Sequence, residues 1–245
     1  MRDPYAGLAP LYDGMARDPG IRLLYSEWRA SLLAAAEEYG VRGRTLVDLA
    51  CGTGNSTIPW TRRRGWAVVG VDRSAAMLRE ARRKSSKVRW VQQDLTALDI
   101  KTKADFVTCH FDALNHVLDT RGLQRALAHV AATLRPGGLF QFDLNTVHML
   151  RWLNGREKLF RTGPHQFMAS NQFDEKTGVA TFRQLWFVKT GRLYQRRNIV
   201  VHERSFTDGA IKTMLRQAGL RLRKVTVSVR VDGKPGRKLY VAVRI

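Results

Sequence analysis

Between residues 45 and 144, short apolar runs alternate with segments of helical apolar spacing, and this alternation limits the fold more than any other feature of the chain. Helices are predicted over 74–83, where Ser74 is a suitable N-cap, and over 122–134, which Arg-Pro-Gly-Gly ends. The predicted strands lie at 45–49, 66–72, 88–94, 105–111 and 139–144. Because such alternation requires right-handed crossovers, we expect an α/β, doubly wound, mostly parallel sheet.

The pattern changes after Asn145. Stretches with a period of two occupy 166–173, 179–188 and 192–202, and turns at 174–178 and 189–191 separate them. This pattern predicts an antiparallel meander inserted after the fifth strand. A helix over 207–217 and strands over 222–231 and 239–245 then follow. The hairpin that joins these strands places one antiparallel strand at or near the sheet edge.

The first predicted strand contains one acid, Asp48, and runs into the turn Ala-Cys-Gly-Thr-Gly. Gly52 and Gly54 can adopt positive φ, which lets the main chain approach a ligand closely. A buried carboxylate is costly unless a neighbouring group satisfies it. The turn therefore predicts a binding site.

Two more acids end predicted strands: Asp72, which is placed to accept both hydroxyls of a ribose, and Asp94, which can face an adenine edge. In a doubly wound sheet, ligands bind at the carboxyl ends of the strands. A nicotinamide site is disfavoured, because its fingerprint requires a third glycine and Thr57 stands at that position. The acid in the first strand would also repel a pyrophosphate.

The bulk composition narrows the class of protein. The chain has 245 residues, enough for one large α/β domain, and no apolar run long enough for a membrane span. The N-terminus has no apolar core typical of a signal peptide, and the two cysteines form neither a disulfide framework nor a metal-ligand spacing. We therefore expect a cytoplasmic protein without a metal, either a monomer or a homodimer.

The charge is large and unevenly placed. The net charge is +21; residues 1–144 contain 21 basic and 15 acidic residues, whereas residues 145–245 contain 21 basic and 6 acidic ones. Such a field raises the local concentration of anionic ligands. An arginine-rich genome with a solvated basic surface would produce the same excess.

The ordered motifs resemble the class I S-adenosylmethionine-dependent methyltransferases. The resemblance rests on Asp-Leu-Ala-Cys-Gly-Thr-Gly, Val-Gly-Val-Asp-Arg-Ser-Ala-Ala-Met-Leu, Gln-Asp-Leu and Leu-Arg-Pro-Gly-Gly, in this order over residues 45–144. It implies one domain over residues 1–245, seven strands in the order 3-2-1-4-5-7-6 with the last antiparallel, and S-adenosyl-L-methionine as cofactor. It also implies a set of cofactor-binding residues, namely Asp48, Ala50, Cys51, Gly52, Gly54, Asp72, Arg73, Met77, Asp94, Leu95, His110 and Phe111.

Two further features resemble the small-molecule subgroup that includes sugar N-methyltransferases. Residues 1–40 look like a helical lid, in which Tyr12 and Trp28 close over the cofactor, and residues 146–206 look like a substrate cap. His116 is the candidate catalytic base. Asn115, Asn145, His148 and Arg204 are weaker candidates for contact with the substrate.

We therefore expect methyl transfer to an amine or hydroxyl of a small, anionic molecule. The alternative is an RNA methyltransferase that binds nucleic acid through its basic C-terminal half. No RNA-binding module is evident, and the segment His-Phe-Asp-Ala after the fourth strand lacks the Asn/Asp-Pro-Pro-Tyr/Phe motif that serves base amino groups. A protein that binds the cofactor without catalysis is a third alternative, which the complete set of acids disfavours.

Overall fold

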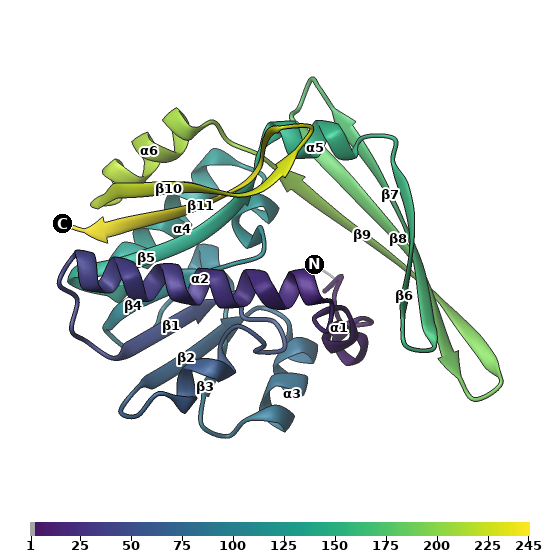
Figure 1. Cartoon of the computed structure of the whole chain (residues 1–245), viewed down its shortest axis with the longest axis horizontal. Helices are drawn as coiled ribbons and strands as arrows, with labels where there is room; N and C mark the ends of the chain where they lie inside the picture. Colours follow the sequence, from purple (N-terminus) through teal and green to yellow (C-terminus); the bar gives the residue numbers. More distant parts are fainter. Residues whose placement is uncertain (1–2) are drawn as a thin grey trace.

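The computed structural model describes residues 3–245 and contains two sheets (Figure 1). The larger sheet has the strand order β10-β11-β5-β4-β1-β2-β3, and within it only β11 runs antiparallel to its neighbours. Its strands are β1 (Thr45–Leu49), β2 (Ala67–Asp72), β3 (Arg89–Gln92), β4 (Ala104–Cys109), β5 (Leu134–Asn145), β10 (Leu220–Val231) and β11 (Lys234–Arg244). The predicted fold class and strand order are confirmed, with β10 and β11 as the sixth and seventh strands.

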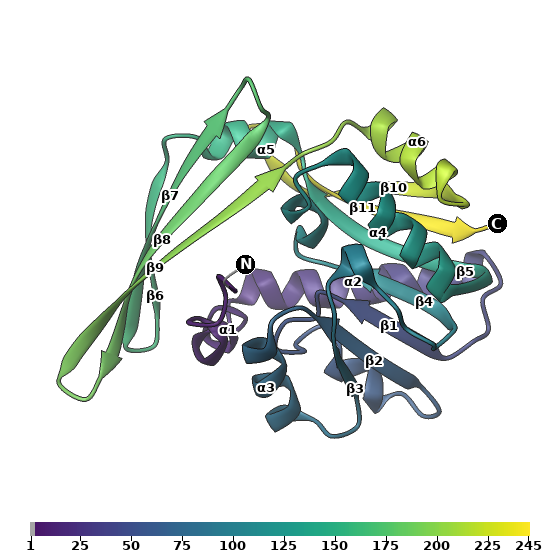
Figure 2. The same ribbon diagram turned by 180° about the vertical axis from the view of Figure 1, so that it is seen from behind.

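Helices cover both faces of this sheet. They are α1 (Ala9–Met15), α2 (Pro19–Glu38), α3 (Ala75–Lys84), α4 (Thr120–Thr133), α5 (Val147–Leu153) and α6 (Asp208–Gln217), with 3-10 turns η1 (Ile58–Arg62), η2 (Leu95–Ala97) and η3 (Ala113–His116). Helix α2 lies on the face seen in Figure 1, and α4 and α6 lie on the face seen in Figure 2. Ser74 caps α3 as predicted, because its hydroxyl accepts a hydrogen bond from the Met77 amide.

The buried core has two main parts because β1 is apolar on both faces. Val47 and Leu49 pack in the cluster with α4 and α6, whereas Leu46 packs in the cluster with α2. This two-sided burial explains why the strand reads as a continuous apolar run. Asp48 is the exception within it.

The segment between β5 and α6 forms a second, antiparallel sheet of order β6-β7-β8-β9. Its strands are β6 (Glu157–Thr162), β7 (His165–Asp174), β8 (Val179–Thr190) and β9 (Leu193–Arg204). Only the last three match the predicted period-two stretches. Strand β6 is a short, charged edge strand whose side chains are mostly exposed, so no apolar alternation marked it in the sequence.

The predicted boundaries around residues 134–138 also differ from the structure. Helix α4 ends at Thr133, and the Arg-Pro-Gly-Gly segment is the start of β5 rather than a loop. The pairing of β5 with β4 is irregular there, passing from Leu134 to Leu139 while β4 advances from Ala104 to Phe106. Gly137, at φ +78°, lies within this irregularity.

Residues 1 and 2, which begin the predicted lid, lie outside the described residues. Among residues 3–245, we find no helix with the length and apolar character needed to cross a membrane.

Candidate active site

A cavity of about 390 Å³ lies at the carboxyl ends of β1, β2 and β4, where the switch in strand order predicts a ligand. A smaller cavity of about 30 Å³ adjoins it. The predicted residues that line the larger cavity are Tyr12, Ala50, Gly52, Asp72, Arg73, Met77, Asp94, Leu95, His110, Phe111 and His116. Asp48 and Cys51 line the smaller one.

Asp48 is only 1% exposed, and three hydroxyl groups satisfy its carboxylate. Oδ2 accepts hydrogen bonds from Ser56 Oγ at 2.7 Å and Thr57 Oγ1 at 2.5 Å, and Oδ1 accepts one from Thr108 Oγ1 at 2.7 Å. The carboxylate therefore ties the turn after β1 to strand β4. These partners follow the glycine turn or stand on another strand, and the sequence does not mark them.

The turn after β1 is shaped by its backbone. Ala50 and Gly52 have φ of +51° and +55°. Asp72 Oδ2 accepts a hydrogen bond from the Gly52 amide and Oδ1 accepts one from the Ser74 amide, both at 2.8 Å. Burial raises the pKa of Asp72, and these two bonds oppose that shift. The turn and the end of β2 are thus held together by one carboxylate.

The other predicted cofactor residues differ in their surroundings. Asp94 caps η2, because Oδ1 accepts hydrogen bonds from Thr96 N at 2.8 Å and Thr96 Oγ1 at 2.7 Å. Gly54 lines neither cavity: a Cβ there would lie 2.5 Å from Trp90 Cη2, so close packing requires the glycine. Trp28 is 1% exposed and packs behind the cavity, with its centroid 4.9 Å from those of His110 and Phe111.

Helix α1 and the residues before it close one side of the larger cavity. Tyr5 and Tyr12 line it, whereas Leu8 and Leu11 pack into the apolar cluster of the second sheet. Asp13, which follows Tyr12, accepts hydrogen bonds from Thr53 Oγ1 at 2.6 Å, Asn55 Nδ2 at 3.0 Å and Lys84 Nζ at 2.7 Å. We call this set of contacts the Asp13 latch; it joins the predicted lid to the turn after β1 and to α3.

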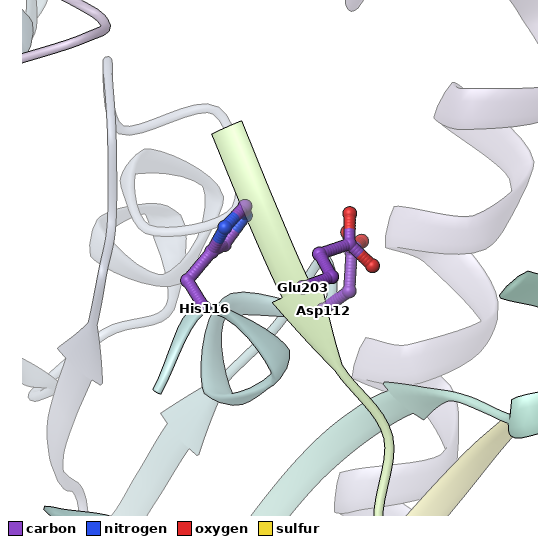
Figure 3. A group of neighbouring side chains, drawn as sticks. All are labelled: Asp112, His116 and Glu203. Atoms are coloured by element: carbon purple, nitrogen blue, oxygen red, sulfur yellow. The ribbon is translucent and has the colours of Figure 1, made fainter. Parts of the chain in front are cut away.

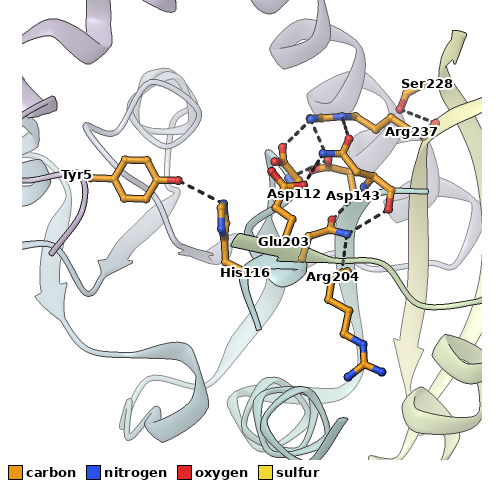
Figure 4. A network of polar contacts seen from close by, with 10 residues as sticks. Tyr5, Asp112, His116, Asp143, Glu203, Arg204, Ser228 and Arg237 are labelled. Carbon is orange, nitrogen blue, oxygen red and sulfur yellow. Dashed lines mark hydrogen bonds and ion pairs between the residues drawn. The ribbon is translucent and has the colours of Figure 1, made fainter. Parts of the chain in front are cut away.

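His116 lies at the end of η3, opposite the acids of β1 and β2. Its Nδ1 lies 2.9 Å from the His202 carbonyl oxygen, so Nδ1 carries the proton, and its Nε2 accepts a hydrogen bond from the Tyr5 hydroxyl at 3.3 Å (Figure 4). Burial lowers the pKa of His116 below its ordinary value of 6.5, and Asp112 opposes this shift. His116 therefore lines the cavity as an imidazole whose acceptor nitrogen, Nε2, is engaged by Tyr5.

Next to His116 lies a buried polar cluster that the sequence did not reveal. Figure 3 shows Asp112, His116 and Glu203 side by side: Asp112 precedes η3, His116 ends it, and Glu203 comes from β9. Arg237 of β11 donates a hydrogen bond to Asp112 Oδ1 at 2.6 Å, and its Nη1 lies 3.1 Å from Asp143 Oδ2. Chemistry-bearing residues from four strand ends therefore meet in one place.

Burial favours the neutral form of two acids in this cluster, because it raises the pKa of Glu203 and that of Asp143. Burial and the neighbouring Asp112 carboxylate raise the pKa of Glu203 well above its usual range. Burial alone would raise the pKa of Asp112, but Arg237 and His116 bring it below its ordinary value. Asp112 is thus the ionised partner of Arg237, and the neutral form is favoured for Glu203.

The four predicted substrate residues lie away from the larger cavity. Asn115 is fully buried and donates hydrogen bonds to the carbonyl oxygens of Asn145 at 3.1 Å and Arg204 at 3.0 Å. It therefore joins the points where the chain enters and leaves the segment that forms the second sheet. Arg204 donates to the Leu118 carbonyl at 3.0 Å. Asn145 and His148 line a separate cavity of about 340 Å³. Their predicted contact with a substrate stays a prediction.

Comparison with known proteins identifies a methyltransferase domain in this chain. The model of a methyltransferase domain matches residues 46–138. The chain is 39% identical over 101 residues to a trans-aconitate 2-methyltransferase of Azoarcus sp. (strain BH72), covering 41% of this chain and 38% of that protein. It is 30% identical over 136 residues to a dTDP-3-amino-3,6-dideoxy-α-D-glucopyranose N,N-dimethyltransferase of Streptomyces fradiae, covering 55% and 52%. The chain spans about half the length of the curated relatives it matches, from 38% to 59%.

Solved structures extend the likeness to nearly the whole chain. An S-adenosylmethionine-dependent methyltransferase from Clostridium acetobutylicum superposes with a TM-score of 0.83 at 25% identity, covering 98% of this chain and 99% of that chain. The sugar N-methyltransferase KedS8 from Streptoalloteichus sp. shares the fold, with a TM-score of 0.77 at 22% identity and coverage of 96% and 91%. The chain therefore contains a methyltransferase domain over residues 46–138 and is similar over nearly its whole length to an S-adenosylmethionine-dependent methyltransferase.

Proposed function

We propose that this chain transfers the methyl group of S-adenosylmethionine to an amine or hydroxyl of a small, anionic molecule. The observation that carries this proposal is the placement of His116: it lines the same cavity as Asp72 and Asp94, yet it faces them from the side of the second sheet. A donor site and a candidate base thus share one enclosed space.

The residues present fit the cofactor. The larger cavity suits an adenosine, with Asp72 for the ribose hydroxyls and Met77 and Leu95 for the purine faces. The smaller cavity suits the amino-acid end, where Asp48 and backbone carbonyls accept from an ammonium group. When bound, its sulfonium supplies an electrophilic methyl group.

His116 would accept the proton of the methyl acceptor at Nε2. The His202 carbonyl fixes Nδ1–H, and the lowered pKa keeps the ring neutral near pH 7. Tyr5 occupies Nε2 at the rather long distance of 3.3 Å, so an incoming amine or hydroxyl could replace it. Orientation supplies most of the rate in such a transfer, and the base adds to it.

An anionic acceptor is supported by charge. Residues 145–245, which include the second sheet, carry 21 basic and only 6 acidic residues. The Streptomyces fradiae relative bears a name that specifies a nucleotide-linked amino sugar, and the Azoarcus relative one that specifies a tricarboxylate. Both acceptors are anionic small molecules, and no comparison favours RNA.

The test is transfer of a labelled methyl group from S-adenosylmethionine to a panel of amino and hydroxy compounds, each with and without a phosphate or carboxylate. We expect turnover with an anionic member and a loss of at least about 100-fold in kcat for His116→Ala. His129→Ala, on α4 and outside both cavities, is the matched control and should keep wild-type turnover. Near-wild-type turnover of His116→Ala would remove its role as a base. If titration calorimetry detected no binding of S-adenosylmethionine, the whole proposal would fail.

A further inference from the structure

The second sheet has one covered face and one exposed face. Its inner face packs against the lid, where Phe167, Trp186 and Ile199 form an apolar cluster with Leu8 and Leu11. Successive side chains of a strand point to opposite faces, and the strand pairing places a second apolar set on the outer face. The exposed members of this set are Leu159, Met168, Phe187, Tyr194 and Val200. Exposed apolar side chains gathered on one face indicate a contact surface.

The most exposed part of this surface is the end of the β8–β9 hairpin. The hairpin extends beyond the turn between β6 and β7 and away from the larger sheet (Figure 1). Its turn lies at residues 191–192, and Leu193, which follows directly, is 77% exposed. Phe187 and Tyr194 are exposed beside it. We call residues 187–196 the hairpin tip.

The hairpin is also uniformly basic. Residues 176–202 contain six lysines and arginines and no aspartate or glutamate. Three of these cations, Lys189, Arg192 and Arg196, are exposed in the hairpin tip and form no ion pair among the contacts described for residues 3–245. The acids of the four strands lie toward the other end of the sheet: Glu157, Asp174 and Glu203. The tip therefore presents apolar and cationic side chains with no anion between them.

An anionic lipid surface matches both properties of the tip. Lipid phosphates attract lysine and arginine, the acyl region accepts an aliphatic side chain, and tyrosine favours the boundary between the two. RNA offers phosphates and base faces, but it offers no apolar phase to Leu193. Two hairpin tips stacked on each other would bury their apolar side chains, but they would also bring their cations together. The charge and the apolar exposure together therefore favour lipid.

We propose that the hairpin tip docks this protein on an anionic lipid surface, with Leu193 and Tyr194 in the interface and the cations of the tip on lipid phosphates. Such a contact requires no membrane-spanning segment. Leu193 and Glu203 are ten residues apart on β9, so the tip lies about 33 Å from the polar cluster beside the cavity. The cavity therefore stays outside the lipid, and docking does not depend on the proposed methyl acceptor.

The test is co-sedimentation of the full chain with two sets of vesicles, one of phosphatidylcholine alone and one of phosphatidylcholine mixed with phosphatidylglycerol. We expect binding to the anionic set alone, and we expect it to weaken as NaCl is added. Leu193→Ser should lower the partition coefficient about tenfold, because a leucine no longer leaves water. Arg192→Gln should lower it about fivefold, because one cation is lost from the surface.

The chain offers a matched control for each variant. Leu23→Ser removes a leucine that is 58% exposed on α2, and Lys224→Gln removes an exposed cation on β10. Both should bind the anionic vesicles as the wild-type chain does. Circular dichroism checks that every variant is folded. If Leu193→Ser failed to fold, Tyr194→Ser would test the same contact.

Four results would overturn the docking surface. The first is equal binding to both sets of vesicles, or binding to neither. The second is unchanged binding of Leu193→Ser, and the third is an equal loss in Lys224→Gln and Arg192→Gln, which would show attraction by net charge alone. The fourth is a wild-type dimer in light scattering that Leu193→Ser dissociates, which would assign the tip to a second copy of the chain. Binding of polyuridylate without binding to vesicles would assign it to RNA instead.

Discussion

Replacing Asp13 with alanine is expected to weaken cofactor binding while the chain stays folded. The carboxylate lies near the surface, with 35% of its side chain exposed, and it accepts hydrogen bonds from Thr53, Asn55 and Lys84. The lid has no other ion pair to the turn after β1 or to α3 among the contacts described for residues 3–245. Loss of the Asp13 latch should therefore shift the lid toward open states.

The expected rise in Kd follows from the free energies of the contacts that Asp13 makes. Each neutral hydrogen bond contributes about 1 kcal/mol. The ion pair with Lys84 contributes about 0.5 kcal/mol after its exposure is taken into account. A closed lid would then lose about 2.5 kcal/mol, which corresponds to a rise of up to about 60-fold in the Kd for S-adenosylhomocysteine.

Titration calorimetry with S-adenosylhomocysteine measures this change. Asp13→Asn keeps hydrogen-bonding capacity without the charge and should fall between wild type and Asp13→Ala. Glu175→Ala breaks an exposed ion pair with Arg151 far from the cavity and is the control for loss of a surface carboxylate. A Kd for Asp13→Ala within twofold of the wild-type value would refute the role of the latch.

Three further predictions concern buried groups. Because burial lowers the pKa of His116, log kcat/KM should rise with pH to a plateau whose midpoint lies below 6.5, and a midpoint above that value in a pH–rate profile would contradict the neutral base. Asp48→Ala leaves two buried hydroxyl groups and the half-buried one of Ser56 without their acceptor, so urea unfolding should show a loss of about 3 kcal/mol, and a loss under 1 kcal/mol would argue against this account. At pH 7, Glu203→Gln should cost less stability than Asp112→Asn, which deprives Arg237 of its closest carboxylate. The pKa of Glu203 is higher in the folded chain than in the unfolded chain, so its contribution to stability is complete below the unfolded pKa and is lost as the pH rises. The stability of Glu203→Gln relative to wild type should therefore increase with pH in urea titrations. A decrease would contradict the raised pKa of Glu203.

The sheet was predictable because its strands carry local signals. Apolar runs and helical spacing marked β1 to β5, and the Asp-Gly-Lys-Pro-Gly turn marked the hairpin of β10 and β11. Strand β6 carried no such signal, because an exposed edge strand needs no apolar alternation. The start of β5 was also missed, since Arg-Pro-Gly-Gly is typical of a turn and only pairing with β4 makes it a strand.

The candidate site also contains residues that the sequence predicted and residues that it did not. Asp72 and Asp94 follow strands whose ends meet at one edge of the sheet, so their convergence was visible in the order of the motifs. Glu203 and Arg237 lie 91 and 125 residues after Asp112 and belong to strands of different sheets, so no spacing connects them. The Asp13 latch is a similar case: its partners stand 40 to 71 residues away along the chain.

The sequence by itself determined the parallel sheet, the glycine turn and the acids at its strand ends, because each depends on residues close together in the chain. The tertiary structure alone decided which ring nitrogen of His116 carries the proton, which carboxyl groups have a raised pKa and which of the N-terminal rings border the cavity. These properties depend on burial and on partners from distant strands. A side chain acquires them only when folding removes water and brings those partners together.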